Sequence, residues 1–473
     1  MPLLPPTGGD RIRKKKATLI LFGGHEANNM GYTEYQNYKR IGSSLIDPLC
    51  CGVPTLVAVG IDTNGNNIYT STDHGNTWIP RAAFGLGGAG FTVIVDTTAT
   101  PPTLIAGGRS SSTGLIMSGG SILTSIKSGT QSVLQMMMSA PTGGQNICTS
   151  IDHGATWTPR PAFGSGFVAA LLLDTTASTI IAGGANQTDG YGIYISKDHG
   201  VSWIPKTAFP GGTCYALATD PVGSPTGSTR IVAVGFDLSA NIYVSDDHGD
   251  TWQPRVANDP TTGGTFYAIV LDTTISPSRL IIVGNDISGN NVYVSDDHGD
   301  TWSPKQAFGG LTGLGRAVIV DDSGVMPTII GVGNAPAIPP PPYGNICIST
   351  DHGDTWVPEE AYDGVGGGQS VVLDTTGPQP TLVSVGYGVA GDNIYTSTDH
   401  GNTWVPRAAF GDGFGYSVIV DTSASPSRLI ACGYGPDGKN IVRSDDHGVT
   451  WIPSNGTPFG VGALGLGLVL QDP

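Results

Sequence analysis

The chain has 473 residues, a formal net charge of −16 and only 13% charged residues. This negative charge repels phosphate backbones and anionic membrane surfaces, so we expect no nucleic-acid partner. The 71 glycines and 34 prolines alternate with short apolar runs such as 91–96, which predicts strands and turns rather than disorder or long helices. None of these runs is long enough to cross a bilayer, so we expect no transmembrane segment.

The first 50 residues carry a basic cluster followed by a short apolar run at 17–22. That run is shorter than the apolar core of a signal peptide, so we predict no secretion signal and an intracellular or particle-associated protein. A basic cluster of this kind is by default a solvated tail. Six cysteines show neither metal-ligand spacing nor a paired framework, so we expect free thiols and no metal or other cofactor.

One octapeptide recurs eight times after this arm, first as Ser71-Thr-Asp-His-Gly-Asn-Thr-Trp78. Successive copies are 46 to 54 residues apart, except for a first interval of 79 that indicates an insertion at about 108–145. Every tryptophan of the chain ends one copy. The aspartates and tryptophans of the eight copies are Asp73, Trp78, Asp152, Trp157, Asp198, Trp203, Asp247, Trp252, Asp297, Trp302, Asp351, Trp356, Asp399, Trp404, Asp446 and Trp451.

Each repeat divides into four apolar runs, which in the fifth copy are 267–272, 280–284, 291–295 and 301–304. Four short strands repeated at this period predict the blades of a propeller. A solenoid is the competing architecture, but it needs distinct terminal caps, and the terminal repeats here are ordinary.

The two ends of the repeat region complement each other. The first repeat begins at its second strand, and the last repeat is followed by an extra run, 466–471, which matches 416–421 except that Gln471 replaces the aspartate. We therefore predict an all-β, eight-bladed propeller of four-stranded antiparallel blades over residues 51–473, closed by the C-terminal strand and preceded by an arm at 1–50. One displaced repeat and a smaller ring is the alternative.

The octapeptide is interpreted as a structural turn between the third and fourth strands. Its Ser and Asp can bind backbone N–H groups, its Gly permits positive φ, and its Trp offers a large apolar face. A residue repeated in every blade is a poor catalytic candidate, because a catalytic site is one asymmetric constellation. The eight histidines stand too far apart to share a metal ion, and we expect them to be solvated turn residues.

The pattern Ser-x-Asp-x-Gly-x-Thr-Trp resembles the Asp-box, or BNR repeat, of sialidase-like propellers, and the resemblance covers roughly residues 51–473. It implies architecture rather than activity. Sialidases of this group use an arginine triad and an Arg-Ile-Pro motif, whereas Arg11-Ile-Arg13 lacks the proline. Outside the repeat pattern the ring holds only Arg109, Arg316 and Arg443, and nothing in the sequence brings them together. We assign no catalytic residue and favour a protein that is not an enzyme.

Similar propellers include sorting receptors and photosystem assembly factors, which bind proteins, so we expect an acidic scaffold that binds a protein partner or a neighbouring copy. The predicted surface is the face opposite the boxes, where the loops of the second and sixth repeats are unusual. Its candidate residues are Met117, Met136, Met137, Met138, Pro339, Pro340, Pro341 and Pro342. The alternatives are a glycan-binding or glycoside-hydrolase propeller, and a structural component of a virus particle or cell surface.

Overall fold

The computed structural model describes residues 20–23, 26–29, 54–62, 64–110, 145–186, 189–257, 264–286, 288–310, 313–335, 344–359, 361–362, 366–388 and 391–471. Every regular element in these ranges is a β-strand. A helix with the length and apolarity needed to cross a membrane does not occur in this described part of the chain.

The strands form repeated four-stranded antiparallel units, in which each strand pairs with the next one along the chain. The first strands are β6 (Ala89–Asp96), β10 (Phe167–Asp174), β14 (Thr213–Asp220), β18 (Thr265–Asp272), β22 (Leu314–Asp321), β26 (Gly367–Asp374), β30 (Phe414–Asp421) and β34 (Leu464–Gln471). The second strands are β3 (Thr55–Ile61), β7 (Thr103–Arg109), β11 (Thr179–Ala185), β15 (Arg230–Phe236), β19 (Arg279–Asn285), β23 (Thr328–Asn334), β27 (Thr381–Tyr387) and β31 (Arg428–Tyr434).

The outer half of each unit is shorter. The third strands are β4 (Ile68–Ser71), β8 (Ile147–Ser150), β12 (Ile193–Ser196), β16 (Ile242–Ser245), β20 (Val292–Ser295), β24 (Ile346–Ser349), β28 (Asp392–Ser397) and β32 (Ile441–Ser444). The fourth are β5 (Ile79–Arg81), β9 (Thr158–Arg160), β13 (Ile204–Lys206), β17 (Gln253–Arg255), β21 (Ser303–Lys305), β25 (Val357–Glu359), β29 (Val405–Ala408) and β33 (Ile452–Pro453). Each fourth strand carries a proline, a residue suited to the edge of a sheet because it has no N–H to offer a new strand.

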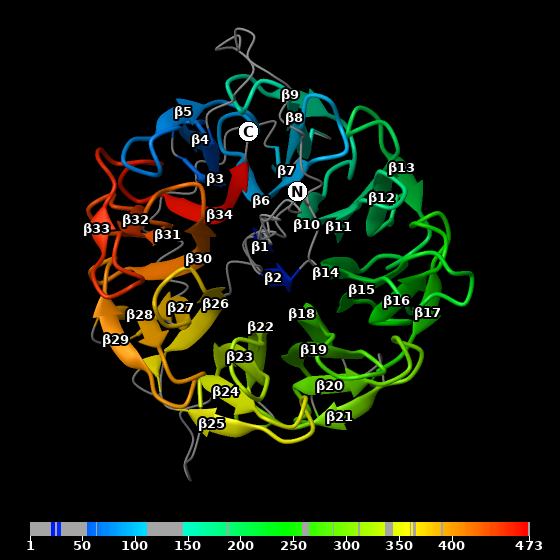
Figure 1. Cartoon of the computed structure of the whole chain (residues 1–473). Helices are drawn as coiled ribbons and strands as arrows, with labels where there is room; N and C mark the ends of the chain where they lie inside the picture. The colour runs from blue at the N-terminus through cyan, green and yellow to red at the C-terminus, as the bar shows by residue number, and fades with distance from the viewer. Residues whose placement is uncertain are drawn as a thin grey trace, which may run out of the picture.

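The units are arranged radially as a β-propeller, with their first strands toward the centre and their fourth strands at the rim (Figure 1). The C-terminal strand β34 pairs antiparallel with β3, so that Thr55 lies opposite Gln471 and Ile61 opposite Leu464. The two ends of the repeat region therefore share one sheet, and β34 takes the place of a first strand there.

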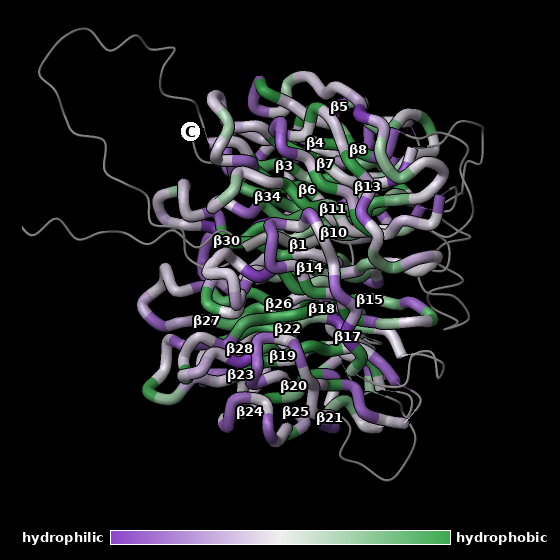
Figure 2. Tube along the Cα trace, turned by 90° about the vertical axis from the view of Figure 1, so that its right-hand side faces the viewer, coloured by the Kyte–Doolittle hydropathy of each residue, from purple (hydrophilic) through white to green (hydrophobic). Residues whose placement is uncertain are grey.

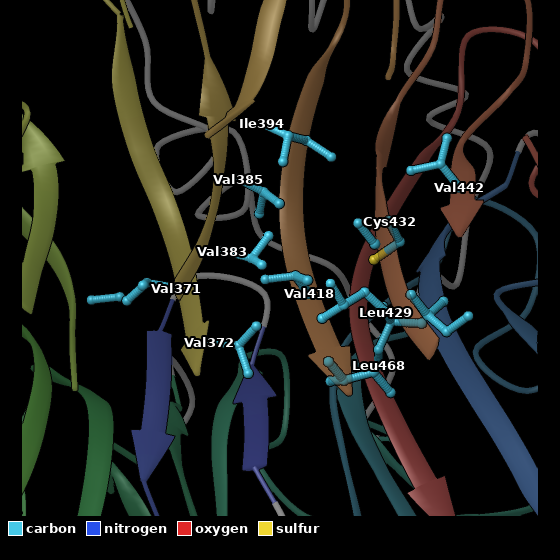
Figure 3. Packing of buried hydrophobic residues seen from close by; sticks show 14 of the residues in the cluster. Val371, Val372, Val383, Val385, Ile394, Val418, Leu429, Cys432, Val442 and Leu468 are labelled. Carbon is cyan, nitrogen blue, oxygen red and sulfur yellow. The ribbon is translucent and has the colours of Figure 1, made fainter. Parts of the chain in front are cut away.

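The hydrophobic core lies between neighbouring sheets. Val372 and Val383 of one unit and Val418 and Leu429 of the next belong to one buried cluster, which Figure 3 shows from close by. Because both faces of a sheet are covered, the first strands are almost continuously apolar, whereas a half-exposed sheet would alternate. The apolar strands occupy the middle of the molecule in side view, and many of the turns at its two ends are hydrophilic (Figure 2).

Two further strands, β1 (Ile20–Gly23) and β2 (Glu26–Asn29), form an antiparallel hairpin at the centre of the propeller (Figure 1). The hairpin contacts the surrounding first strands, and β2 runs parallel to β18 with Asn28 opposite Ile269. The arm predicted at 1–50 therefore reaches the axis of the ring in this part. Its basic cluster at 11–16, predicted to be a solvated tail, lies outside the described residues.

Candidate functional site

The Asp box forms a hydrogen-bonded turn between the third and fourth strands. In the fifth copy Asp297 accepts hydrogen bonds from the Thr301 backbone N at 2.8 Å and from Thr301 Oγ1 at 2.6 Å, and Ser295 Oγ donates to Asp297 at 2.8 Å. Trp302 Nε1 donates to the Gly299 carbonyl at 3.1 Å. Burial alone would raise the pKa of Asp297, but these hydrogen bonds outweigh burial and lower it. The box side chains are thus occupied within their own turn.

The box histidine holds two neighbouring units together. All eight adopt φ between 55° and 60°, a left-handed conformation in which histidine is more common than most residues other than glycine. In seven of them Nδ1 lies 2.6–3.0 Å from the buried aspartate that ends the first strand of the preceding unit. These pairs are His74–Asp421, His199–Asp96, His248–Asp174, His298–Asp220, His352–Asp272, His400–Asp321 and His447–Asp374.

The expectation that these histidines are only solvated turn residues is therefore wrong for the seven. In six of the pairs the histidine and its aspartate are 73 to 103 residues apart in the sequence, and His74 and Asp421 are 347 residues apart. No local sequence pattern therefore reveals the contact. The eighth position differs. Gln471 stands where the aspartate would be, and its two side-chain polar atoms and His153 Nδ1 are buried without a hydrogen-bond partner among the described residues.

A second ring of residues lies at the opposite end of the first strands. In every unit the pairing between the first two strands skips the third residue of the first strand, which makes that residue a β-bulge. Bulges re-aim side chains and are common beside functional sites. We call these eight residues the bulge ring: Phe91, Ala169, Tyr215, Tyr267, Arg316, Gln369, Tyr416 and Leu466.

Side chains of the bulge ring meet across unit boundaries. The rings of Tyr215 and Tyr267 have centroids 5.3 Å apart, and the Arg316 guanidinium lies 4.9 Å from the centroid of Tyr267. Because the first strands lie around the centre of the propeller, the bulge ring surrounds the axis (Figure 1). The bulge ring was not predicted from the sequence, although an alignment of the repeats offers a signal: the position varies from Phe to Arg to Gln while its neighbours remain apolar or small.

The predicted site residues divide between described and undescribed parts. Segments 111–144 and 336–343, which contain the predicted methionines and prolines of the loop surface, lie outside the described residues. Arg109, Arg316 and Arg443 lie on β7, β22 and β32 of three different units, and only Arg316 belongs to the bulge ring. Within the described ranges, no group of three or more His, Cys, Asp or Glu residues could hold a metal ion.

The chain is similar to known proteins in its Asp boxes and in its fold. The BNR/Asp-box repeat family matches residues 243–254 and 293–304. No curated protein sequence matches the chain.

Similar solved structures include YCF48 from Cyanidioschyzon merolae, at 15% identity and a TM-score of 0.40 over 70% of this chain and 89% of that one. A GH74 enzyme from Niastella koreensis is 15% identical, with a TM-score of 0.35 over 89% of this chain and 73% of that one. The Dos1 propeller is 10% identical, with a TM-score of 0.48 over 81% and 88%. The chain therefore carries BNR/Asp-box repeats, and the matched residues span the third and fourth strands of two of its four-stranded sheets, β16–β17 and β20–β21.

Proposed function

We propose that residues 51–473 form a closed, eight-bladed propeller whose function is binding rather than catalysis. The β3–β34 pairing supports closure, because it joins the first and last repeats in one sheet. The His74–Asp421 contact at 3.0 Å supports it too, because it links the first box to the last complete unit, β30–β33. A closed ring joins its first and last blades, which makes it a rigid frame for loops.

The proposed binding surface is the face that holds the bulge ring. The histidine–aspartate contacts place the boxes beside the C-terminal ends of the first strands, so the bulges lie at the other face. Segments 111–144 and 336–343 follow Arg109 and Asn334, which pair with Ala89 and Leu314 at the start of their first strands. The described residues that precede both segments therefore lie on the face that carries the bulge ring.

The amino-acid composition of the bulge ring supports a binding function over a catalytic one. It holds four aromatic residues and an arginine, residue types that contribute strongly to protein interfaces. None of the eight is a carboxylate, whereas glycoside hydrolysis usually needs a pair of them. Because six of the eight side chains are buried, a protein partner or a neighbouring copy would meet this asymmetric ring mainly through the loops that border it.

The test compares two variants of the full chain. One replaces 111–144 by a Gly-Asn turn between β7 and β8, and the other is Val325→Ser, which alters a fully exposed residue beside the boxes. Self-association is measured by sedimentation equilibrium, and partner capture by comparing proteins retained by each immobilised variant.

We expect the loop replacement to melt like the wild type and to lose the association, and Val325→Ser to keep both. A loop replacement that folds and still associates or captures the same partner would contradict the choice of face. Equal loss in Val325→Ser would do the same, since that change lies at the other face.

A further inference from the structure

Arg316 is a buried cation without a visible counter-charge. The residue is only 8% exposed, and its Nε and Nη1 donors have no hydrogen-bond partner among the described residues. A guanidinium removed from water without an anion loses solvation that nothing replaces, which is why buried charges in proteins are normally paired. The position therefore implies a partner beyond the described side chains.

Two arginines that begin second strands, Arg230 of β15 and Arg279 of β19, show what pairing looks like. Arg230 is 3% exposed and donates from Nε to Asp246 at 2.8 Å and from Nη2 to the same carboxylate at 3.1 Å. Arg279 holds Asp296 in the same way, at 2.6 Å and 3.1 Å. The fold thus supplies a carboxylate to each of these guanidiniums.

The surroundings of Arg316 are aromatic and neutral. Tyr267 lies beneath the guanidinium, and Asn334 donates a hydrogen bond to the hydroxyl of Tyr387. Burial raises the pKa of Tyr387 and of Tyr416, and the nearby Arg316 charge opposes that rise in both. An aromatic face attracts a cation but supplies no hydrogen-bond acceptor for its N–H groups. The missing component of the site is an anionic acceptor.

We propose that Arg316 binds a carboxylate group at the axis of the bulge ring. The inference rests on the proposed binding function and names the chemistry of the ligand. A carboxylate matches the planar guanidinium in charge and geometry, and forms hydrogen bonds stronger than those between neutral groups. The tyrosine rings around it exclude water and so strengthen the attraction.

Two sources could supply this carboxylate. One is a ligand that enters from the face of the bulge ring. The other is Glu26 of the chain itself, because β2 runs parallel to β18 with Asn28 opposite Ile269, which puts Glu26 level with Tyr267 along the axis. The strand β2 also contacts β22, which carries Arg316.

The experiment titrates the full chain with acetate and with its neutral analogue acetamide at constant ionic strength. Binding is followed by the melting temperature and by the arginine Nε–H resonance that disappears in Arg316→Gln. The variants are Arg316→Gln, Arg316→Lys and Glu26→Gln, and Arg255→Gln is the control because it removes the same charge from an outer strand, where Arg255 pairs with Asp300.

For an external ligand, acetate but not acetamide should stabilise the wild type, Glu26→Gln and Arg255→Gln. Arg316→Gln should weaken the acetate response about 10- to 100-fold, the factor expected for one charge-assisted hydrogen bond, and Arg316→Lys less. If Glu26 is the source, the wild type should not respond to acetate, Glu26→Gln should respond, and the effects of Arg316→Gln and Glu26→Gln on melting should not add.

An acetate response absent from both the wild type and Glu26→Gln would overturn the proposal, and so would an equal response in Arg316→Gln. A failure of the carboxylate site can be distinguished from a failure of the proposed binding function. If the loop replacement loses partner capture while Arg316→Gln responds to acetate like the wild type, the binding face stands and the carboxylate site falls. If neither variant changes capture but acetate binding depends on Arg316, the site stands without the protein partner.

Discussion

The contact between His352 and Asp272 should measurably stabilise the propeller. His352 Nδ1 lies 2.8 Å from the Asp272 carboxylate, and the two side chains are 24% and 0% exposed. We expect Asp272→Asn and His352→Asn each to lower the free energy of unfolding, because each removes a bond between neighbouring units. Asparagine is chosen at 352 because it tolerates the left-handed backbone found there, where φ is 58°.

The size of the effect follows from burial. A hydrogen bond to a charged group contributes about 1.5–3 kcal/mol, and the low exposure of this pair favours the upper half of that range. Asp272 also accepts a hydrogen bond from the Thr274 backbone N at 2.9 Å, so Asp272→Asn should cost more than His352→Asn. At His199–Asp96 the imidazole is 42% exposed, and solvent screening should reduce the coupling to about 1 kcal/mol or less.

A double-mutant cycle isolates the contact from the backbone effects of each substitution. Equilibrium urea unfolding, followed by the fluorescence of the box tryptophans, gives the four free energies. The chain provides a matched control in His153 and Gln471, which occupy the same positions without a hydrogen bond. The cycle of His153→Asn with Gln471→Asn should therefore show coupling near zero.

The reasoning fails if the Asp272–His352 coupling is below about 0.5 kcal/mol, the usual limit of additivity between independent sites. It also fails if the control cycle couples as strongly, since the histidine position itself would then matter and the carboxylate would not.

Three further predictions concern stability. Removing 464–473 deletes β34 and should abolish a single cooperative urea transition, whereas a truncated chain that melts like the full one would contradict closure. Trp252→Ala should lower the free energy of unfolding by about 3–5 kcal/mol because the residue is 7% exposed, and Trp302→Ala should lower it less because that residue is half-buried. Equal losses would show that packing is not the cause. The pKa of each box aspartate is lowered on folding, so stability should be full near neutrality and fall as the pH drops below about 4, which melting curves between pH 7 and 3 can test.

The fold was predictable from the sequence because its signals are local and repeated. The box turn, the apolar runs and the four-strand period are each visible within one repeat, and eight copies reinforce them. A bulge leaves no such trace within a single repeat. Tyr267 looks like one more apolar residue in 265–272, and only the pairing of Phe266 with Gly284 and Ala268 with Val283 shows that it is skipped.

The candidate site was less predictable because its contacts join distant repeats. Arg316 was noted as irregular, but its neighbours Tyr267 and Tyr387 lie 49 and 71 residues away, on other units. Its significance comes from the absence of an acidic partner in the described residues, which depends on the packing of several sheets. The histidines were misinterpreted for the same reason, since the aspartate that each contacts belongs to the preceding unit.

The two faces of the propeller differ in how well they could hold a bound partner in one orientation. Segments Asn67–Trp78 and Asn393–Trp404 are identical over twelve residues, so a partner that met only the boxes would find nearly the same surface at several positions around the ring. The bulge ring holds six residue types at its eight positions and carries a single charge, at Arg316. A partner bound in one orientation must distinguish one blade from the next, and specificity arises only where affinities differ. Because most side chains of the bulge ring are buried, such a partner would have to read these differences through the loops that border the ring.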